Sequence, residues 1–350
     1  MNRLSSMWYW HAIVFLAVGC VSTEGRAVEV IDFVDVYGLR TLSREAVLAA
    51  AGVKPGDNVP VASEEIVRKL EALPGVARAA VAVIHAPAMP SSGKTIVVVY
   101  LGVDESPEPR ATYKPAPRGE FVLPDALVAT YEDFERSLAA SMNRGDYGED
   151  DSNGYALVGD EASRTIQKQF VPLAEQHFDQ LIKVLQNAES ERQRAIAAWV
   201  IGYASDKRRV AAELTGAVRD SEKTVRNNAM RGLAIIIGFA QHHPELKLDV
   251  SCDTFIDMLD SVKWTDRNKA MAVLNALIET DMNTLAELRE RALPGLAEMA
   301  RWHYEGHATQ AFFILAKVAG LNEEQMVEAW RAGKRDEVIA RALARTDVQR

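Results

Sequence analysis

The sequence predicts a small N-terminal α+β domain, of order β-α-α-β-β, joined to an all-α superhelical solenoid of paired helices. Three observations lead to this fold class. Strand-like runs of β-branched and aromatic residues occur in the first third of the chain. A proline-rich segment follows them. Beyond that segment, one short helical pattern recurs at intervals typical of repeat proteins.

The N-terminal domain is predicted over residues 28–104. Its first strand-like run ends at Tyr37-Gly38, a turn signal. Ser43 and Ser63 are both suited to cap a helix, because a serine hydroxyl can accept a hydrogen bond from a backbone N–H of the first turn. Gly52 is suited to end the first of these helices. The expected strands are 28–36, 79–84 and 95–103, with the two helices between the first and the second.

Three stretches of this region carry a family resemblance: Val36-Tyr37-Gly38-Leu39-Arg40-Thr41, Gly52-Val53-Lys54-Pro55-Gly56-Asp57 and Leu73-Pro74-Gly75-Val76. They resemble the POTRA domain, a polypeptide-transport-associated module of outer-membrane assembly, secretion and some division proteins. The resemblance implies a module that accepts an extended peptide beside an exposed strand edge. Such modules usually occur in tandem before a membrane β-barrel. After residue 104 the sequence shows no repeated strands of alternating polarity, so a role in barrel assembly is not implied.

A semi-extended linker is expected at 105–124, which holds five prolines and few large apolar residues. From residue 125 the spacing of apolar residues becomes helical, beginning with Leu127, Tyr131 and Phe134. We therefore predict that residues 125–350 form the solenoid with capping helices at both ends.

The repeated pattern starts at Arg194, Arg226, Arg267 and Ala308, which are 32, 41 and 41 residues apart. A small or apolar residue follows each start at the third or fourth position and an aliphatic residue at the seventh. These starts are expected in the second helix of each pair. The first helices are expected at 176–187, 207–218, 253–262 and about 287–302, and Asp206, Asp220 and Asp266 are suited to cap the helices that follow them.

The segment from Asp220 to Ala229 is the best match to a HEAT repeat of the short bacterial kind, and Leu293-Pro294-Gly295-Leu296 resembles the proline-bent first helix of a unit. The resemblance covers roughly residues 165–350 and implies stacked helix pairs, because one pair cannot bury its apolar stripe alone. The three arginines are expected to bridge to acidic turn residues of an adjoining unit. A direct contact between these arginines and a ligand is the alternative.

Residues 1–27 resemble an export signal, with a positive charge at Arg3 and an apolar run from Met7 to Val18. That run is shorter than the roughly 20 residues that span a bilayer. Two processing sites compete. Gly25-Arg26-Ala27 offers small residues for cleavage, whereas Ala17-Val18-Gly19-Cys20 resembles a lipobox that makes Cys20 a candidate for lipidation. We therefore expect an exported protein of the periplasm or cell envelope that contacts a membrane only through such a lipid anchor.

The chain carries a net charge of −9, which disfavours nucleic acid as a partner. The second repeat unit is nevertheless locally basic. We take Arg208, Arg209, Arg226 and Asn227 as candidate partner-binding residues, with a solvated surface as the alternative. Four tryptophans of the helical region are candidates for an apolar peptide groove or, alternatively, for the core: Trp199, Trp264, Trp302 and Trp330.

No cofactor is expected, although two places offer metal-binding residue types. Residues 149–160 have the spacing of an EF-hand calcium loop, but Glu replaces Asp at its first position and Asp replaces the bidentate Glu at its last. An ordinary acidic loop is the alternative. His303 and His307 are one helical turn apart but do not form a zincin motif. Cys252 is expected to be a packed thiol. The ligand positions in the acidic loop are Glu149, Asp151, Asn153, Gly154 and Asp160.

These features predict a non-enzymatic scaffold or adaptor of the cell envelope. The solenoid would bind a protein or peptide partner, and the small domain would pair with an extended segment. Two other functions stay open: a metal-dependent sensor or enzyme built on the solenoid, and a mechanical envelope spacer.

Overall fold

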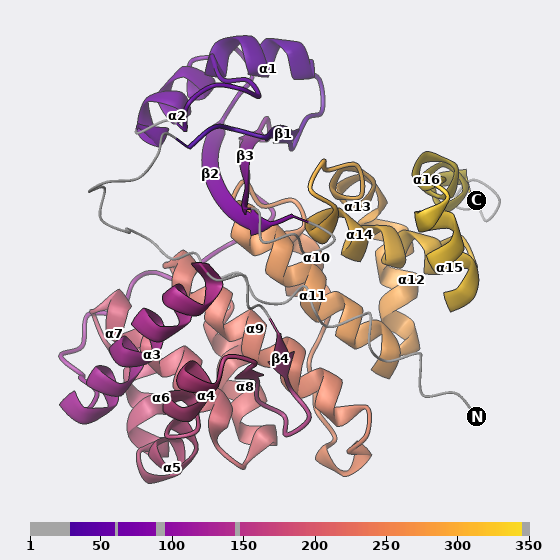
Figure 1. The fold of residues 1–350 in the computed structure, drawn as a ribbon. Helices are drawn as coiled ribbons and strands as arrows, with labels where there is room; N and C mark the ends of the chain where they lie inside the picture. Colours follow the sequence, from indigo (N-terminus) through magenta and orange to yellow (C-terminus); the bar gives the residue numbers. More distant parts are fainter. Residues whose placement is uncertain (1–28, 60–61, 89–94, 144–147, 345–350) are drawn as a thin grey trace. The chain divides into compact units, whose positions relative to one another are not determined.

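The computed structural model describes residues 29–59, 62–88, 95–143 and 148–344 (Figure 1). The predicted signal segment and Cys20 lie outside these residues. Within them the chain divides into two compact units. The first unit contains residues 112–251 and 272–280, and the second contains 29–111, 252–271 and 281–344. The change of unit between residues 111 and 112 falls inside the predicted linker.

The small α+β module of the second unit has the predicted element order. Its three-stranded sheet has the order β1-β3-β2, with β1 parallel and β2 antiparallel to β3. Phe33 pairs with Val98 and Ala82 with Tyr100, which fixes the register. The first strand begins later than the sequence predicted. The elements are β1 (Phe33–Tyr37), α1 (Arg44–Ala51), α2 (Ser63–Glu71), β2 (Arg78–Pro87) and β3 (Thr95–Asp104).

Local chemistry explains the first helix of the module. The Ser43 side chain accepts a hydrogen bond from the Ala46 amide, and Gly52 ends α1 in a left-handed conformation with φ 66°. Both predictions are confirmed. The prediction for Ser63 is wrong, because Ser63 is the first residue of α2 and the preceding Ala62 provides no side-chain cap.

Both faces of the sheet are covered. The helices α1 and α2 lie beside the sheet (Figure 1). Alternate residues of the strands, among them Val34, Val99 and Leu101, pack with α1 and α2 in one apolar core. The residues between them face the opposite way, and there Tyr37 and Tyr100 contact Trp302. The predicted small domain therefore packs against helices of its own unit.

The remaining helices of the second unit follow the predicted pairing only in part. The first helix expected at about 287–302 is instead two helices that break at Ala292, because Pro294 starts a new helix. The helix expected at 253–262 ends at Met258. The helices are α10 (Asp253–Met258), α11 (Trp264–Thr280, whose last turns belong to the first unit), α12 (Met282–Arg291), α13 (Leu293–Met299), α14 (Glu305–Val318), α15 (Glu323–Arg331) and α16 (Arg335–Ala344).

The first unit is a helical repeat-like body, in which α6 packs on α7 and α8 on α9. The expected first helices at 176–187 and 207–218 correspond closely to α6 and α8. The elements are α3 (Asp125–Asn143), β4 (Glu149–Asp150), β5 (Leu157–Val158), α4 (Glu161–Gln167), α5 (Phe170–Gln176), α6 (Phe178–Asn187), α7 (Glu191–Val200), η1 (Ile201–Tyr203), α8 (Lys207–Ala217), α9 (Lys223–Ala240) and η2 (Pro244–Leu246).

Of the three predicted capping aspartates, only Asp206 caps a helix, accepting a hydrogen bond from the Arg209 amide. Glu222 caps α9 in place of Asp220. Asp266 lies inside the first turn of α11, where it accepts a hydrogen bond from Ser261 Oγ. A tertiary partner, Arg194, thus binds Asp220, whereas Asp266 lies too far inside α11 to cap it.

None of the helices within the described ranges combines the length and the apolar character that membrane crossing requires.

Candidate functional site

The first pattern arginine, Arg194, is buried and saturated with hydrogen bonds. Its Nε and one terminal nitrogen donate to the two carboxylate oxygens of Asp220, at 2.8 and 2.9 Å. The other terminal nitrogen donates to the carbonyls of Ala188 and Glu189 in the turn before α7. Asp220 lies in the turn between α8 and α9, so the predicted bridge from an arginine to an acidic turn residue of the next helix pair is confirmed at this position.

Arg226 repeats the turn contact but has an aromatic neighbour. A terminal nitrogen donates to the carbonyls of Asp220 and Ser221, at 2.9 and 3.0 Å. The ring of Tyr113 lies over the guanidinium, 4.0 Å from Cζ to the ring centroid. In-plane donors thus bind the turn, while one planar face is available to a π system.

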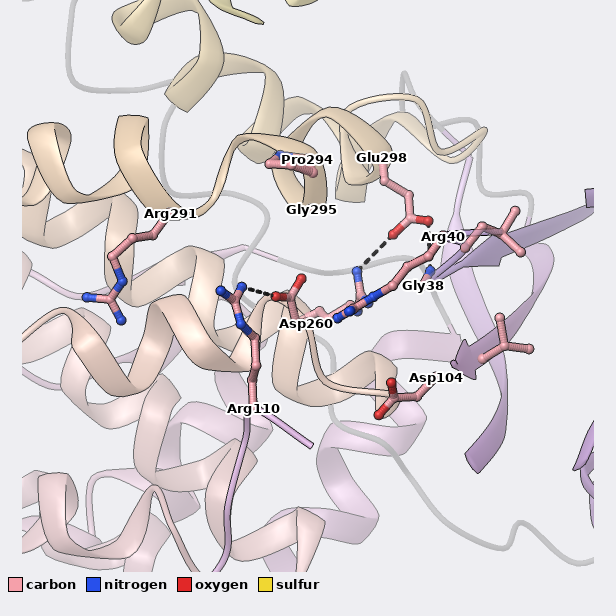
Figure 2. A pocket seen from close by; sticks show the side chains of 12 residues that line it. Gly38, Arg40, Asp104, Arg110, Asp260, Arg291, Pro294, Gly295 and Glu298 are labelled. Carbon is pink, nitrogen blue, oxygen red and sulfur yellow. Dashed lines mark hydrogen bonds and ion pairs between the residues drawn. The ribbon is translucent and has the colours of Figure 1, made fainter. Parts of the chain in front are cut away.

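Arg267 belongs to the second unit and connects the helices of that unit to the small module. It donates to the Ser261 carbonyl at 2.6 Å and to Glu298 Oε2 at 2.9 Å. The ring of Tyr37 lies over its guanidinium at 4.6 Å. The other oxygen of Glu298 accepts a hydrogen bond from the Gly38 amide at 2.7 Å. The turn at Tyr37-Gly38, singled out in the sequence, is therefore held by an arginine–glutamate pair (Figure 2).

A polar pocket of about 390 Å³ surrounds this contact. Figure 2 shows the side chains that line it. Arg110 reaches Asp260 at 2.5 Å, and the Arg267–Glu298 pair lies beside them. Because arginines and carboxylates are paired inside it, the pocket is close to neutral. Its lining residues are Gly38, Leu39, Arg40, Val103, Asp104, Arg110, Asp260, Arg267, Arg291, Pro294, Gly295 and Glu298.

A second recess, the β1 groove, runs between β1 and α1 and encloses about 490 Å³. β1 pairs with β3 on one side and has no other strand partner among the described residues. One guanidinium nitrogen of Arg44 donates to the Val34 carbonyl at 2.7 Å. The groove is lined by Phe33, Val34, Arg44, Leu48, Ala49, Gly52, Val53, Lys54, Pro55, Asp57 and His303. An edge strand beside a recess of this composition is the geometry in which an extended peptide can add to a sheet.

The four candidate partner-binding residues separate by exposure. Arg208 and Arg209 are exposed on α8, and Arg209 pairs with Asp179 at 3.1 Å. Arg226 and Asn227 are buried, at 2% and 4% exposed. The structure therefore gives Arg226 and Asn227 places inside the helical body. Binding through Arg208 and Arg209 stays a prediction.

The acidic loop is a short hairpin formed by β4 and β5. Glu149, the first expected calcium ligand, pairs with Arg231 instead. Asp160, the last, caps α4 by accepting a hydrogen bond from the Ser163 amide at 2.9 Å. The two ends of the expected ligand set thus have protein partners, and across the described ranges no three His, Cys, Asp or Glu side chains group as a metal site.

His303 and His307 make separate contacts. The His303 ring nitrogen Nδ1 lies 2.6 Å from Asp35 Oδ1, and its ring stacks on Phe33. His307 Nδ1 lies 2.7 Å from the Tyr100 hydroxyl, deep against Trp264. Asp35 and Tyr100 are paired residues of β1 and β3 on one face of the sheet, and each contacts a different histidine ring. The helical spacing that suggested chelation is therefore used for packing against this face.

Burial lowers the pKa of His307 to about 3, and nearby Lys269 adds to this effect. Because the unfolded state binds a proton near pH 6.5 and the folded state does not, stability should rise with pH between about 3 and 6.5. Replacing His307 by Gln should reduce this slope by up to about 1.4 kcal/mol per pH unit. Urea unfolding at pH 5.0, 6.0 and 7.5 measures it. Exposed His242→Gln is the control, and an equal slope in both variants would contradict the assignment.

Three of the four tryptophans belong to the core. Trp199, Trp264 and Trp302 are at most 5% exposed, and Trp330 is half-buried against Phe312. The alternative of core packing is therefore correct for the first three. Cys252 is a half-buried free thiol, and burial raises its pKa, which disfavours the reactive thiolate.

The sequence interpretation missed Tyr113 and Gly119, which it treated as part of a linker. Tyr113 covers Arg226, and the Gly119 amide donates to the Asn187 carbonyl at 2.9 Å. The sequence signal for them was a tyrosine and a glycine inside a proline-rich segment. A linker that makes no contacts does not need either residue type.

Comparison with known proteins identifies no family. No protein-family model matches the chain, and no curated protein matches it. Among solved structures, a designed armadillo repeat protein matches at 17% identity over 53% of this chain and 94% of its own, with a TM-score of 0.35. Computationally designed armadillo repeat proteins for modular peptide recognition match at 16% identity, with the same coverage and TM-score. A likeness at this level carries no functional argument.

Proposed function

We propose that the chain is a non-enzymatic protein-binding scaffold of the cell envelope, whose POTRA-like module pairs with an extended segment of a partner. One observation carries the proposal: β1 is an edge strand of the described sheet, and a groove of about 490 Å³ lies directly beside it. The free groups of an edge strand can form main-chain hydrogen bonds with an added strand.

The composition of the β1 groove suits an extended peptide. Leu48 and Val53 are half-buried and form an apolar wall on the α1 side. Lys54 and Asp57 lie at the turn that follows α1 and provide one charge of each sign. Arg44 already donates to the Val34 carbonyl, so an incoming strand would share this acceptor with it. Main-chain pairing would supply affinity, and the apolar wall would favour alternate apolar side chains on the peptide.

The helical body is proposed to hold a folded partner or peptide through the exposed pair Arg208 and Arg209 on α8. Two adjacent cations on an otherwise acidic chain favour an acidic partner. Reversing both charges should then weaken recovery of the partner. Unchanged recovery would mean that Arg208 and Arg209 are solvated surface residues without a role in binding.

Export is part of the same proposal. The segment 1–27 would direct the chain across the membrane, and Cys20 is the proposed lipid attachment site if the lipobox is used. Metabolic labelling with a palmitate analogue, compared between the natural chain and Cys20→Ser, distinguishes an anchored envelope protein from one that is cleaved after Ala27.

Photo-crosslinking in intact cells tests the β1 groove. Ala49 is an exposed residue that lines the groove, whereas Ala72 is an exposed alanine at the end of α2 outside it. A photo-reactive amino acid at position 49 of the full chain should give a discrete adduct with a protein, and the same group at position 72 should not. Equal adducts from both positions, or no adduct from position 49, would contradict the proposal.

A blocking substitution gives a second measurement. Ala49→Trp places a large ring in the groove, and we expect it to reduce co-purification of that crosslinked partner by about tenfold. Ala72→Trp is the matched control and should leave recovery and thermal stability unchanged.

A further inference from the structure

Residues 112–123, here named the strap, are bound along the first unit largely by their backbone. The Lys114 amide donates to the Arg219 carbonyl at 2.7 Å, in the turn between α8 and α9. The Gly119 amide donates to the Asn187 carbonyl at 2.9 Å, and the Glu189 amide donates to the Gly119 carbonyl at 2.8 Å. The strap therefore pairs with two successive interhelical turns, as an extended peptide would.

Two side chains of the helical body also bind the backbone of the strap. Gln193 Oε1 accepts a hydrogen bond from the Leu123 amide at 2.7 Å, and Gln180 Nε2 donates to the Val122 carbonyl at 2.8 Å. Glutamines that reach main-chain groups hold an extended segment without reading its side chains. The body thus presents donors and acceptors that any extended chain of suitable length can use.

Tyr113 is the aromatic side chain of the strap that contacts the body, and the neighbouring Lys114 Nζ donates to the Gly216 carbonyl at 2.9 Å. The tyrosine ring lies over Arg226, whose in-plane hydrogen bonds to the Asp220 and Ser221 carbonyls are complete without it. Tyr37 lies over Arg267 in the second unit in the same way. A guanidinium fixed in its plane and covered by an aromatic ring is thus a recurrent arrangement of the pattern arginines, and it selects an aromatic side chain.

Gly119 is the second position where the strap must match the body. A Cβ at this residue would lie 2.6 Å from the Asn187 carbonyl oxygen, closer than a carbon atom can approach. Only glycine allows the backbone to come this near to the turn.

The strap itself buries few of its large side chains. Tyr113, Phe121 and Val122 are 36%, 43% and 63% exposed, whereas Leu123, at the end of the strap, is buried at 2%. Releasing residues 112–122, with Leu123 left in place, would therefore lose a few hydrogen bonds and one stacked ring, but little apolar burial. A segment held in this manner can be replaced by a competing peptide that makes the same contacts.

We infer that the turn surface beneath the strap is a peptide-binding site that the chain occupies with its own residues. Its partner would be an extended segment with an aromatic residue that covers Arg226 and, six positions later, a glycine at the Asn187 turn. This inference does not depend on the β1 groove, because it concerns the other compact unit.

The test uses the full chain with Gly119→Val, in which the strap can no longer approach Asn187 closely. The probe is a fluorescent synthetic peptide of residues 111–124, followed by anisotropy. Because a tethered strap competes at a high effective concentration, the natural protein should bind the peptide at least about tenfold more weakly than the variant. A probe with Tyr113→Ala should lose about tenfold in affinity for the variant.

Two controls make the outcome decisive. Ala116→Val introduces the same valine side chain at an exposed position of the strap and should behave as the natural protein. A second variant replaces residues 112–122 by glycine and serine. It removes the contacts of the strap and does not depend on the folding of the Gly119→Val variant. The inference is overturned if the probe binds the natural chain and both altered chains equally, or binds none of them.

Discussion

Gly38→Ala is expected to destabilise the protein by on the order of 3 kcal/mol, one of the two largest single-residue effects that the structure predicts. Gly38 has φ 85°, and a Cβ there would lie 1.9 Å from the Val103 carbonyl oxygen. Relief requires the turn after β1 to move, which would break the hydrogen bond from the Gly38 amide to Glu298. Urea unfolding monitored by tryptophan fluorescence measures the loss.

Gly56→Ala is the matched control for this prediction. Gly56 has a similar φ of 91°, but nothing lies within 4 Å of an added Cβ. Only the backbone preference is then lost, at a cost of about 1 kcal/mol. If the two alanine variants unfold at the same urea concentration, the close approach at Gly38 is not what the turn depends on.

Arg194→Met is expected to cost about 3–5 kcal/mol, because it leaves the Asp220 carboxylate with a buried charge and no guanidinium partner. It also removes the hydrogen bonds that hold the Ala188 and Glu189 carbonyls. A double variant that also carries Asp220→Asn should recover part of the loss, since the uncompensated charge is gone. Thermal and urea unfolding of the four proteins in this cycle give the coupling between the two residues.

The exposed pair of Arg209 and Asp179 is the control for this prediction. Arg209 and Asp179 lie 3.1 Å apart, but their side chains are 49% and 76% exposed. Arg209→Met should therefore change stability by less than about 1 kcal/mol. A comparable loss from Arg209→Met and Arg194→Met would mean that burial does not set the strength of the arginine contacts.

Local sequence signals predicted the small module well. Its element order depends on short-range chemistry, such as the Ser43 cap and the left-handed Gly52, which act within a few residues. The bridge from Arg194 to Asp220 could also be predicted, because the repeat period places successive interhelical turns next to each other. The assignment at Asp220 was wrong because Arg194 of another helix pair binds its carboxylate, and the one at Asp266 was wrong because α11 already begins at Trp264.

The candidate sites were harder to predict. Arg226 and Asn227 were predicted to bind a partner because charged and amide side chains are usually exposed, yet both are buried. His303 and His307 suggested a metal because a helical turn separates them, yet Asp35 and Tyr100 of the small module contact them separately. The β1 groove needed both β1 and the turn after α1 to be placed in space.

By itself the sequence determined the class and order of the elements, because the periodicity of apolar residues, caps and turn residues act locally. It also determined the repeat pattern of arginines that hold the interhelical turns. Only the tertiary structure decided that the sheet packs against helices of its own unit and that Tyr113 and Gly119 secure the strap. Such contacts join residues tens to hundreds of positions apart, and their strength depends on burial and on close backbone approach, which no local pattern records.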